Sequence, residues 1–265
     1  MDNKTNSSAV PEEKLIMENL RELKSVFDEF GIKFWLDWGT LLGAVRDGKV
    51  LAWDSDADIG LMTDDYEKIV STFPELKKRG FLIDEMPIPT SETILRKFCF
   101  TRFGSLLDTW PYYYEKDEDA MVSFVPCAAS GNLISRKLTR GLWILYRLLL
   151  SCEMDTDSSP RLVLKWFIKR FLFLMPAKLK NYLTKKVEKI LIKKEKGAHI
   201  RRIIVPKHYF EKLENIDFYG MTFNVPSQVK EYVKYKYGEN WEIPDKGWDW
   251  KNDGAVGFLK KTKKI

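Results

Sequence analysis

The spacing of apolar side chains predicts a helix where the chain begins to fold. From Glu12 to Phe30, apolar residues recur at steps of three and four, which is the period of one helix face. They are Ile16, Leu20, Leu23, Phe27 and Phe30. Pro11 suits the first helical position and Gly31 suits the end. We therefore predict an amphipathic helix over residues 12–30, after a polar, disordered lead-in at residues 1–10.

The next part of the chain alternates between strand and helix patterns. Residues 34–38 read as a strand that ends at a Gly39-Thr40 turn, where a short helix begins and runs to Arg46. The patterns that follow predict extended structure at 49–53, a strand through 59–62, a helix over 63–78, and strands at 81–84, 94–103 and 105–110. This mixture predicts an α/β (α+β) fold in which helices flank a mixed β-sheet.

The pattern becomes helical from residue 135 to about residue 196 and mixed again afterwards, with a helix predicted at 227–237. We therefore expect a core at residues 11–134 and a basic helical insert at 135–200. A helical C-terminal part at 201–265 is expected to pack on the core.

Three carboxylates alternate in the stretch after Trp53, at Asp54, Asp56 and Asp58. On an extended strand, residues two apart point to the same face, so these side chains can converge on one cation. Without a cation, such close like charges repel one another. Asp108 lies alone in an apolar run, and a buried carboxylate needs a partner, for which the same cation is the natural candidate.

Several other residues suit the binding of a phosphate. The Gly39-Thr40 turn precedes a helix N-terminus, where free N–H groups attract anions. Lys97 and Arg102, with Arg96, lie on the strand predicted at 94–103, where they can face a phosphate-rich substrate. Together with the carboxylates, these residues form the arrangement that metal-dependent phosphoryl or nucleotidyl transfer requires.

Two other interpretations of the carboxylates are weaker. An EF-hand calcium loop has the same spacing at its first three ligands, but it also needs Gly and Glu where this chain has Ile59 and Asp65. Solvated surface acids are also less favoured, because the three lie between Trp53 and an apolar run. For Arg46, a simple ion pair with Asp47 remains open as an alternative to substrate binding.

The segment Gly39-Thr-Leu-Leu-Gly-Ala-Val-Arg46, followed by Trp53-Asp-Ser-Asp-Ala-Asp-Ile59, resembles the LicD family. This family of nucleotidyltransferase-fold proteins includes bacterial phosphocholine transferases and fukutin-related ribitol-phosphate transferases. Phe223-Asn-Val-Pro226 and Tyr237-Gly-Glu-Asn-Trp-Glu-Ile-Pro244 are similar to its C-terminal pattern. The resemblance implies transfer of an alcohol phosphate, with phosphocholine as the first choice, from a CDP-alcohol such as CDP-choline. A hydroxyl of a cell-surface glycan or glycolipid precursor, as in lipopolysaccharide biosynthesis, would accept it, and CMP would be released.

The resemblance also implies roles for individual residues. Asp56 and Asp58 would bind Mg²⁺ (or Mn²⁺), and Asp108 would be the third carboxylate and the base for the acceptor hydroxyl. Asp54 is a weaker metal ligand that positions the loop. Gly39 and Thr40 would contact a phosphate, and Arg46 would bind one. In place of the family's common Pro before Trp-Asp, this chain has Ala52, which removes no ligand.

The composition shows where positive charge is concentrated, but it does not identify the class of protein. The net charge of +6 hides an asymmetry, because residues 161–202 hold 14 Lys and Arg against 2 Glu. Such a segment suits an anionic surface, so peripheral membrane contact through 161–196 is one expectation. No apolar stretch reaches the length of a membrane span. The three separated cysteines favour a reducing, cytoplasmic setting, and we expect no nucleic acid partner.

Two other functions stay open. One is a nucleotidyltransferase that moves NMP from an NTP to an acceptor. The other is a non-catalytic adaptor that binds a membrane or RNA through the basic segment, although an adaptor has no need for a cluster of mutually repelling acids.

Overall fold

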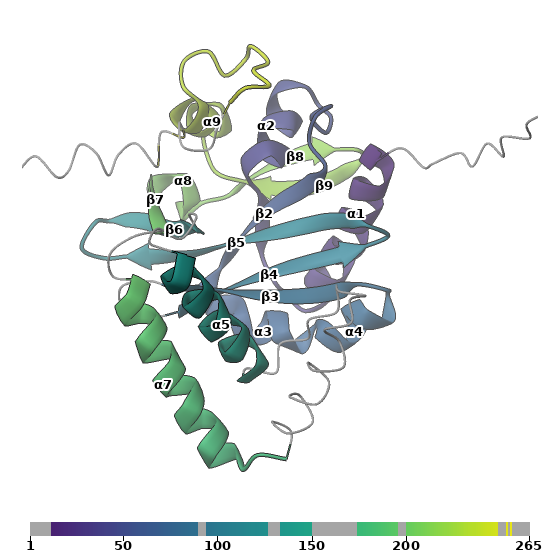
Figure 1. Ribbon diagram of the computed structural model, residues 1–265. Coiled ribbons are helices and arrows are strands. Elements are labelled where there is room, and N and C mark those ends of the chain that lie inside the picture. The colour runs from purple at the N-terminus through teal and green to yellow at the C-terminus, as the bar shows by residue number, and fades with distance from the viewer. Residues whose placement is uncertain are drawn as a thin grey trace, which may run out of the picture.

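The structure is a computed structural model that describes residues 12–89, 94–126, 133–149, 174–195 and 200–248, together with Asp253 and Ala255. Within these residues the centre is a nine-stranded mixed sheet, shown in Figure 1. The strands are β1 (Phe34–Leu36), β2 (Asp56–Met62), β3 (Leu82–Pro89), β4 (Ile94–Arg102), β5 (Ser105–Glu115), β6 (Ala120–Pro126), β7 (Ile200–Pro206), β8 (Glu214–Phe218) and β9 (Met221–Val225).

Helices surround this sheet in the described part of the chain. They are α1 (Glu12–Glu29), α2 (Trp38–Arg46), the 3-10 helix η1 (Thr63–Asp65), α3 (Tyr66–Ser71), α4 (Phe73–Lys78), α5 (Leu133–Leu149), α7 (Ala177–Glu195), α8 (His208–Glu211) and α9 (Val229–Tyr237). None of them is long and apolar enough to cross a membrane.

The order of the strands places the acidic strand β2 inside the sheet. The main path runs β3-β4-β5-β2-β1-β9-β8. Strand β2 is antiparallel to β1 and parallel to β5, and β1 is parallel to β9. The second half of β5 pairs with β6, which pairs with β7. Strands from the C-terminal part therefore extend both the main sheet and the β5-β6 branch.

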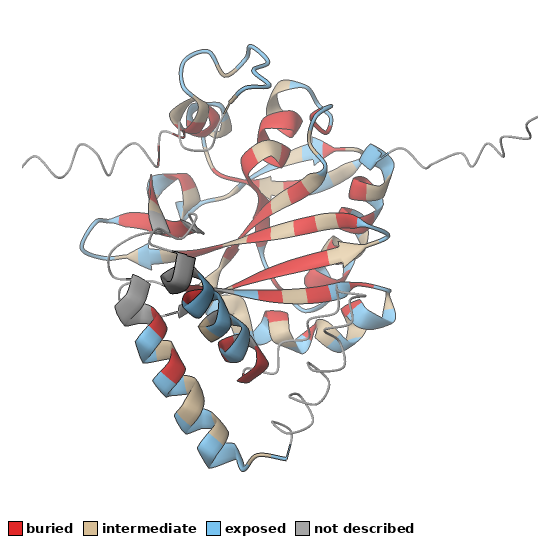
Figure 2. Cartoon of the chain, in the orientation of Figure 1, coloured by how far each residue is buried: buried red, intermediate tan, exposed pale blue. Residues whose placement is uncertain are grey.

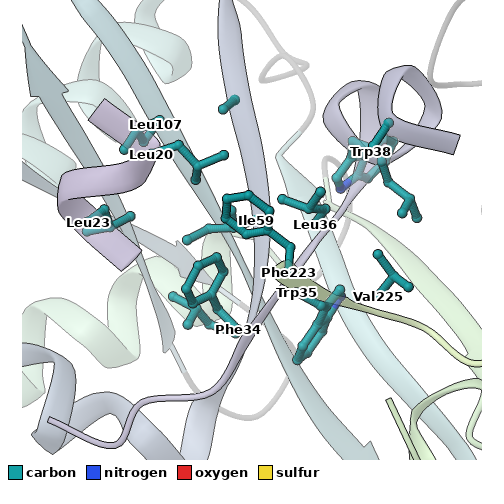
Figure 3. Packing of buried hydrophobic residues seen from close by; sticks show 14 of the residues in the cluster. Leu20, Leu23, Phe34, Trp35, Leu36, Trp38, Ile59, Leu107, Phe223 and Val225 are labelled. Carbon is teal, nitrogen blue, oxygen red and sulfur yellow. The ribbon is translucent and has the colours of Figure 1, made fainter. Parts of the chain in front are cut away.

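The helix α1 confirms the first prediction from the sequence. Its apolar stripe is buried against the sheet, including Leu20 and Leu23. Figure 3 shows these two leucines near Phe34 of β1 and Ile59 of β2. Phe27 completes the contact edge-on, with its ring centroid 5.8 Å from that of Phe34. The helix is held by apolar packing over one face of the strands that carry the acids.

Three predicted elements differ in the structure. The helix expected over residues 63–78 is broken at Thr72, because Pro74 lacks an N–H and cannot continue the preceding helix. Residues 49–53 are not a strand, and Asp54 precedes β2 after a turn in which its N–H bonds to the Leu51 carbonyl. The C-terminal part, expected to be helical, also supplies β7, β8 and β9.

The expected insert appears as the helices α5 and α7, which lie in sequence between the paired strands β6 and β7. The disordered lead-in predicted at residues 1–10 lies outside the described residues. So does residue 161, where the expected membrane-contact segment begins, and the basic segment is described only from residue 174 onward.

Gly60 shows how closely β1 and β2 pack. It pairs with Trp35 across the two strands. A Cβ atom on Gly60 would lie 2.1 Å from the Trp35 ring, closer than any real contact. Trp35 is buried, so its ring has little room to move away.

We expect Gly60→Ala to lower the free energy of unfolding by about 1–3 kcal/mol through overpacking. Urea unfolding of the purified protein measures this. Gly141→Ala is the matched control, because a Cβ atom there meets nothing within 4 Å on an exposed helix position. It should be neutral or raise stability by about 0.5–1 kcal/mol. Equal effects of the two changes would contradict the packing argument.

Candidate active site

The N-terminus of α2 forms one wall of the site. The helix begins at Trp38, so Gly39 and Thr40 lie in its first turn and not before it, because the buried Asp37 caps the helix at the Trp38 N–H. The Thr40 hydroxyl accepts a hydrogen bond of 2.8 Å from the Asp58 N–H, and the Asp37 N–H bonds to the Asp58 carbonyl. This helix end is therefore fixed to the acidic strand β2.

Gly39 allows a close approach between this helix end and the acidic loop. A Cβ atom on Gly39 would lie 2.2 Å from Oδ2 of Asp54. Any larger residue would therefore displace the Asp54 carboxylate. The glycine expected to contact phosphate also sets the position of an acid.

The carboxyl groups of Asp54 and Asp58, in the turn before β2 and in β2 itself, have raised pKa values. Burial, followed by a hydrogen bond and repulsion from Asp56, raises the pKa of Asp54 to about 7. Burial and then repulsion from Asp56 raise the pKa of Asp58 well above its usual value, although Trp110 donates a 2.8 Å hydrogen bond to it. Such a cluster favours a cation, which would neutralise the repelling charges.

Asp108 lies directly beside Asp58 in the parallel pairing of β2 and β5. Its predicted partner was the same cation, but the structure gives it protein partners. The Lys97 ammonium lies 2.6 Å from Oδ2 of Asp108, and the Cys99 thiol donates to Oδ1. Lys97 is buried and sits 3.5 Å from the centroid of the Trp110 ring. The lysine therefore compensates the Asp108 charge and supports the tryptophan that holds Asp58.

A cleft of ≈ 590 Å³ opens beside these acids, between α2, the acidic turn and the segment after α9. Its aromatic lining consists of Trp38, Trp53, Tyr237, Trp241 and Trp248. Its polar lining includes Gly39, Arg46, Asp54, Asp58, Asp245 and Lys246. Aromatic rings beside both acids and cations form a site suited to a nucleotide-like ligand.

The cleft brings together only some of the residues predicted from the sequence. Arg46 lines it and also forms a bidentate pair with Asp47, at 2.8 and 2.9 Å, so the simple ion pair exists beside the expected position. Thr40 is buried and positions Asp58 from behind. Arg102 lies at the hairpin end of β4, where it bonds to the Arg79 carbonyl and not in the cleft lining.

The donor chemistry of the acidic cluster fits Mg²⁺, which prefers carboxylate oxygens. Among the described residues, no three His, Cys, Asp or Glu side chains converge closely enough to form a ready metal cage. Mg²⁺ does not require one, because it is commonly bound by one or two carboxylates together with water and substrate phosphates. Asp58 and Asp54 line the cleft and Asp56 repels both, so these three suit that role.

A buried polar network under α2 was not predicted from the sequence. Asp37 accepts hydrogen bonds from Tyr112 and Tyr232, and the Lys236 ammonium lies 3.1 Å from its Oδ1 atom. Lys236 also pairs with Asp253 at 3.6 Å. Asp37 lies in an apolar run between two tryptophans, so its need for a buried partner can be predicted from the sequence as it is for Asp108.

Residues 31–126 match the family model described as the LicD/FKTN/FKRP nucleotidyltransferase domain. The matched range begins three residues before β1, ends at the last residue of β6, and contains β2 and β5. Over this part, the chain matches the nucleotidyltransferase domain of the LicD family, and its similarity to FKRP and FKTN supports membership of that family.

Curated relatives agree with this membership. The human ribitol 5-phosphate transferase FKRP is 27% identical over 38% of this chain and 21% of its own length. The human ribitol-5-phosphate transferase FKTN is 19% identical over 92% of this chain and 36% of its own. The chain therefore spans only a fifth to about a third of these relatives. The solved structure of ANT(2″)-Ia in complex with adenylyl-2″-tobramycin matches 67% of this chain and 98% of its own, with 12% identity and a TM-score of 0.29.

Asp253 gives the buried network a dependence on pH. Burial raises the pKa of its carboxyl from 3.8 to about 6, although Lys236 acts in the opposite direction. The folded protein then binds this proton more tightly than the unfolded chain does. The stabilisation that comes from protonated Asp253 is complete below about pH 4 and is lost as the pH rises through about 6.

We expect Asp253→Asn to remove this loss. Between about pH 4 and 6, the free energy of unfolding of the unmodified protein should fall, relative to the variant, by on the order of 1 kcal/mol per pH unit. Urea unfolding at a series of pH values measures the difference, in which the titration of other groups cancels. Parallel profiles for the two proteins would refute the assignment.

Proposed function

We propose that this protein transfers an alcohol phosphate from a CDP-alcohol to a hydroxyl group of a glycan or glycolipid precursor and releases CMP, in a reaction that depends on Mg²⁺ or Mn²⁺. The observation that carries the proposal is a single cleft lined by Asp54 and Asp58, by Gly39 at a helix N-terminus and by the cation Arg46. The activity of the relatives FKRP and FKTN, ribitol 5-phosphate transfer, supports the class of reaction.

The residues of the cleft divide into two groups that suit the two ends of such a donor. The acidic group, with Asp56 beside it, would hold the metal ion, which supplies positive charge to the phosphate oxygens when bound. The basic group consists of Arg46 and Lys246, whose charged ends lie 5.6 and 5.7 Å from the centroid of Trp53. A cytosine ring stacked on Trp53 would place its diphosphate within reach of both cations.

The chemistry is a displacement at phosphorus. The acceptor oxygen bonds to the phosphorus that carries the alcohol, the bond from that phosphorus to the bridging oxygen breaks, and CMP leaves with this oxygen. The hydroxyl proton passes to a carboxylate. Asp108 was the candidate base, but its two oxygens already bond to Lys97 and Cys99, whereas Asp58 faces the cleft. We therefore assign the base role to Asp58 and charge compensation beside it to Asp108.

The direct test is incubation of the protein with CDP-choline, CDP-ribitol and NTPs, with Mg²⁺ and a glycan acceptor, followed by mass spectrometry of the products. We expect CMP from a CDP-alcohol. We also expect Asp56→Asn and Asp58→Asn each to slow its release by about a hundredfold or more, because each removes a metal-binding carboxylate and Asp58→Asn also removes the base.

Asp64→Asn, which changes an exposed acid outside the cleft, is the control and should leave the rate unchanged. Pyrophosphate from an NTP, with a nucleotide left on the acceptor, would replace the proposal by nucleotidyl transfer. Binding to membranes or RNA that survives loss of the acids, without any turnover, would replace it by the adaptor function.

Lys246 provides a separate test of how the donor binds. Because its ammonium would pair with the diphosphate, we expect Lys246→Gln to raise the KM for the CDP-alcohol about tenfold and to leave kcat unchanged. Steady-state kinetics measures both. Lys230→Gln, at an exposed position on α9, is the matched control. An unchanged KM in the Lys246 variant would show that the segment after α9 does not contact the donor phosphates.

A further inference from the structure

The helices α5 and α7 form a hairpin with a small apolar core of its own. Tyr146 and Leu149 of α5 pack against Val187 and Leu191 of α7. In Figure 2 the buried positions of α7 appear as red bands among pale blue ones. The two helices therefore bury apolar side chains against each other.

A group of apolar side chains remains exposed on the two helices. We call it the hairpin surface, and it consists of Leu138, Ile144, Leu145, Leu179, Tyr182 and Ile190. Leu138 is 56% exposed and Tyr182 is 60% exposed, which is far more than a packed side chain allows. On α7 these residues recur at helical spacing, on a face separate from that of Val187 and Leu191. Apolar residues gathered in this way indicate a surface that meets a partner.

Positive charge borders the hairpin surface. Helix α5 contains no acidic residue, and α7 contains seven lysines against two glutamates. Lys178, Lys185 and Lys189 are exposed and share one side of α7 beside the apolar stripe. Lys186 lies within the stripe, with its ammonium 5.9 Å from the centroid of the Tyr182 ring. The long lysine side chains can extend past the apolar residues to reach anionic groups.

These two features together identify one kind of partner. An apolar stripe bordered by lysines is the arrangement of a helix that lies in the interface of an anionic bilayer. The leucines and the tyrosine enter the boundary of the acyl chains, and the lysines remain at the level of the lipid phosphates. A nucleic acid would engage the lysines but would leave the apolar stripe in water.

We infer that the hairpin surface docks the protein on an anionic lipid bilayer. The inference goes beyond the proposed reaction and does not depend on it, because it concerns residues outside the cleft.

The experiment is flotation of the full chain with vesicles of phosphatidylcholine alone and of phosphatidylcholine mixed with phosphatidylglycerol. We expect binding to the mixed vesicles that weakens as salt is added. Leu179→Gln with Tyr182→Gln should weaken this binding about tenfold, and so should Lys178→Gln with Lys185→Gln and Lys189→Gln. Loss of both apolar and charge contributions distinguishes docking from simple electrostatic attraction.

Matched controls change the same chemistry elsewhere. Lys33→Gln with Lys116→Gln and Lys230→Gln alters the net charge equally at other exposed positions, and Phe30→Gln with Leu82→Gln removes apolar side chains of similar exposure. Both controls should bind like the unmodified protein.

Three results would overturn the inference. The first is equal weakening in the control and hairpin variants. The second is RNA binding that is lost with the α7 lysines while vesicle binding is absent. The third is a lower melting temperature for Leu179→Gln with Tyr182→Gln, since this would show that the chain itself covers the stripe. CMP release is measured separately and tests only the proposed reaction.

Discussion

The ion pair between Asp37 and Lys236 is the interaction on which the candidate site depends. Both side chains are fully buried, and the pair joins the capping residue of α2 to the last turn of α9. Removing one partner of such a pair leaves an uncompensated charge in the interior, at a cost of about 3–5 kcal/mol. The pair therefore fixes α9, and the cleft wall that follows it, against the helix N-terminus that faces the acids.

The same lysine supports a strained residue. Trp38 adopts a φ of 44°, in the region that side chains other than glycine rarely occupy. The Lys236 ammonium lies 3.8 Å from the centroid of the Trp38 ring, and Trp110 packs beside that ring at 4.9 Å. Trp38 in turn lines the cleft. Strain of this kind persists only where the surroundings enforce it, and here buried charge and aromatic packing do so beside the acids.

Register within the sheet decides which acids act together. Asp58 and Asp108 are neighbours because β2 and β5 run parallel with these residues opposite each other. Lys97, on the strand beyond, pairs with Asp108 and so offsets part of the repulsion that Asp108 exerts on Asp58. Trp110, held above Lys97, then orients Asp58 by a hydrogen bond. The arrangement separates an acid with its own protein cation from acids that are free to bind a metal ion.

Features that depend on local spacing could be predicted from the sequence. The apolar period of α1, the alternation that places Asp56 and Asp58 on one strand, and the motif around Gly39 all follow from residues close together in the chain. The sequence also indicates that Asp108 needs a partner, but its pattern predicts a metal ion in that place and predicts that Lys97 binds phosphate. Long-range packing pairs Lys97 with Asp108, places Arg102 outside the cleft lining, and forms the cleft wall that contains Lys246. Lys236 lies 199 positions from Asp37, and no local pattern specifies such a contact because sheet pairing and packing alone bring the two together.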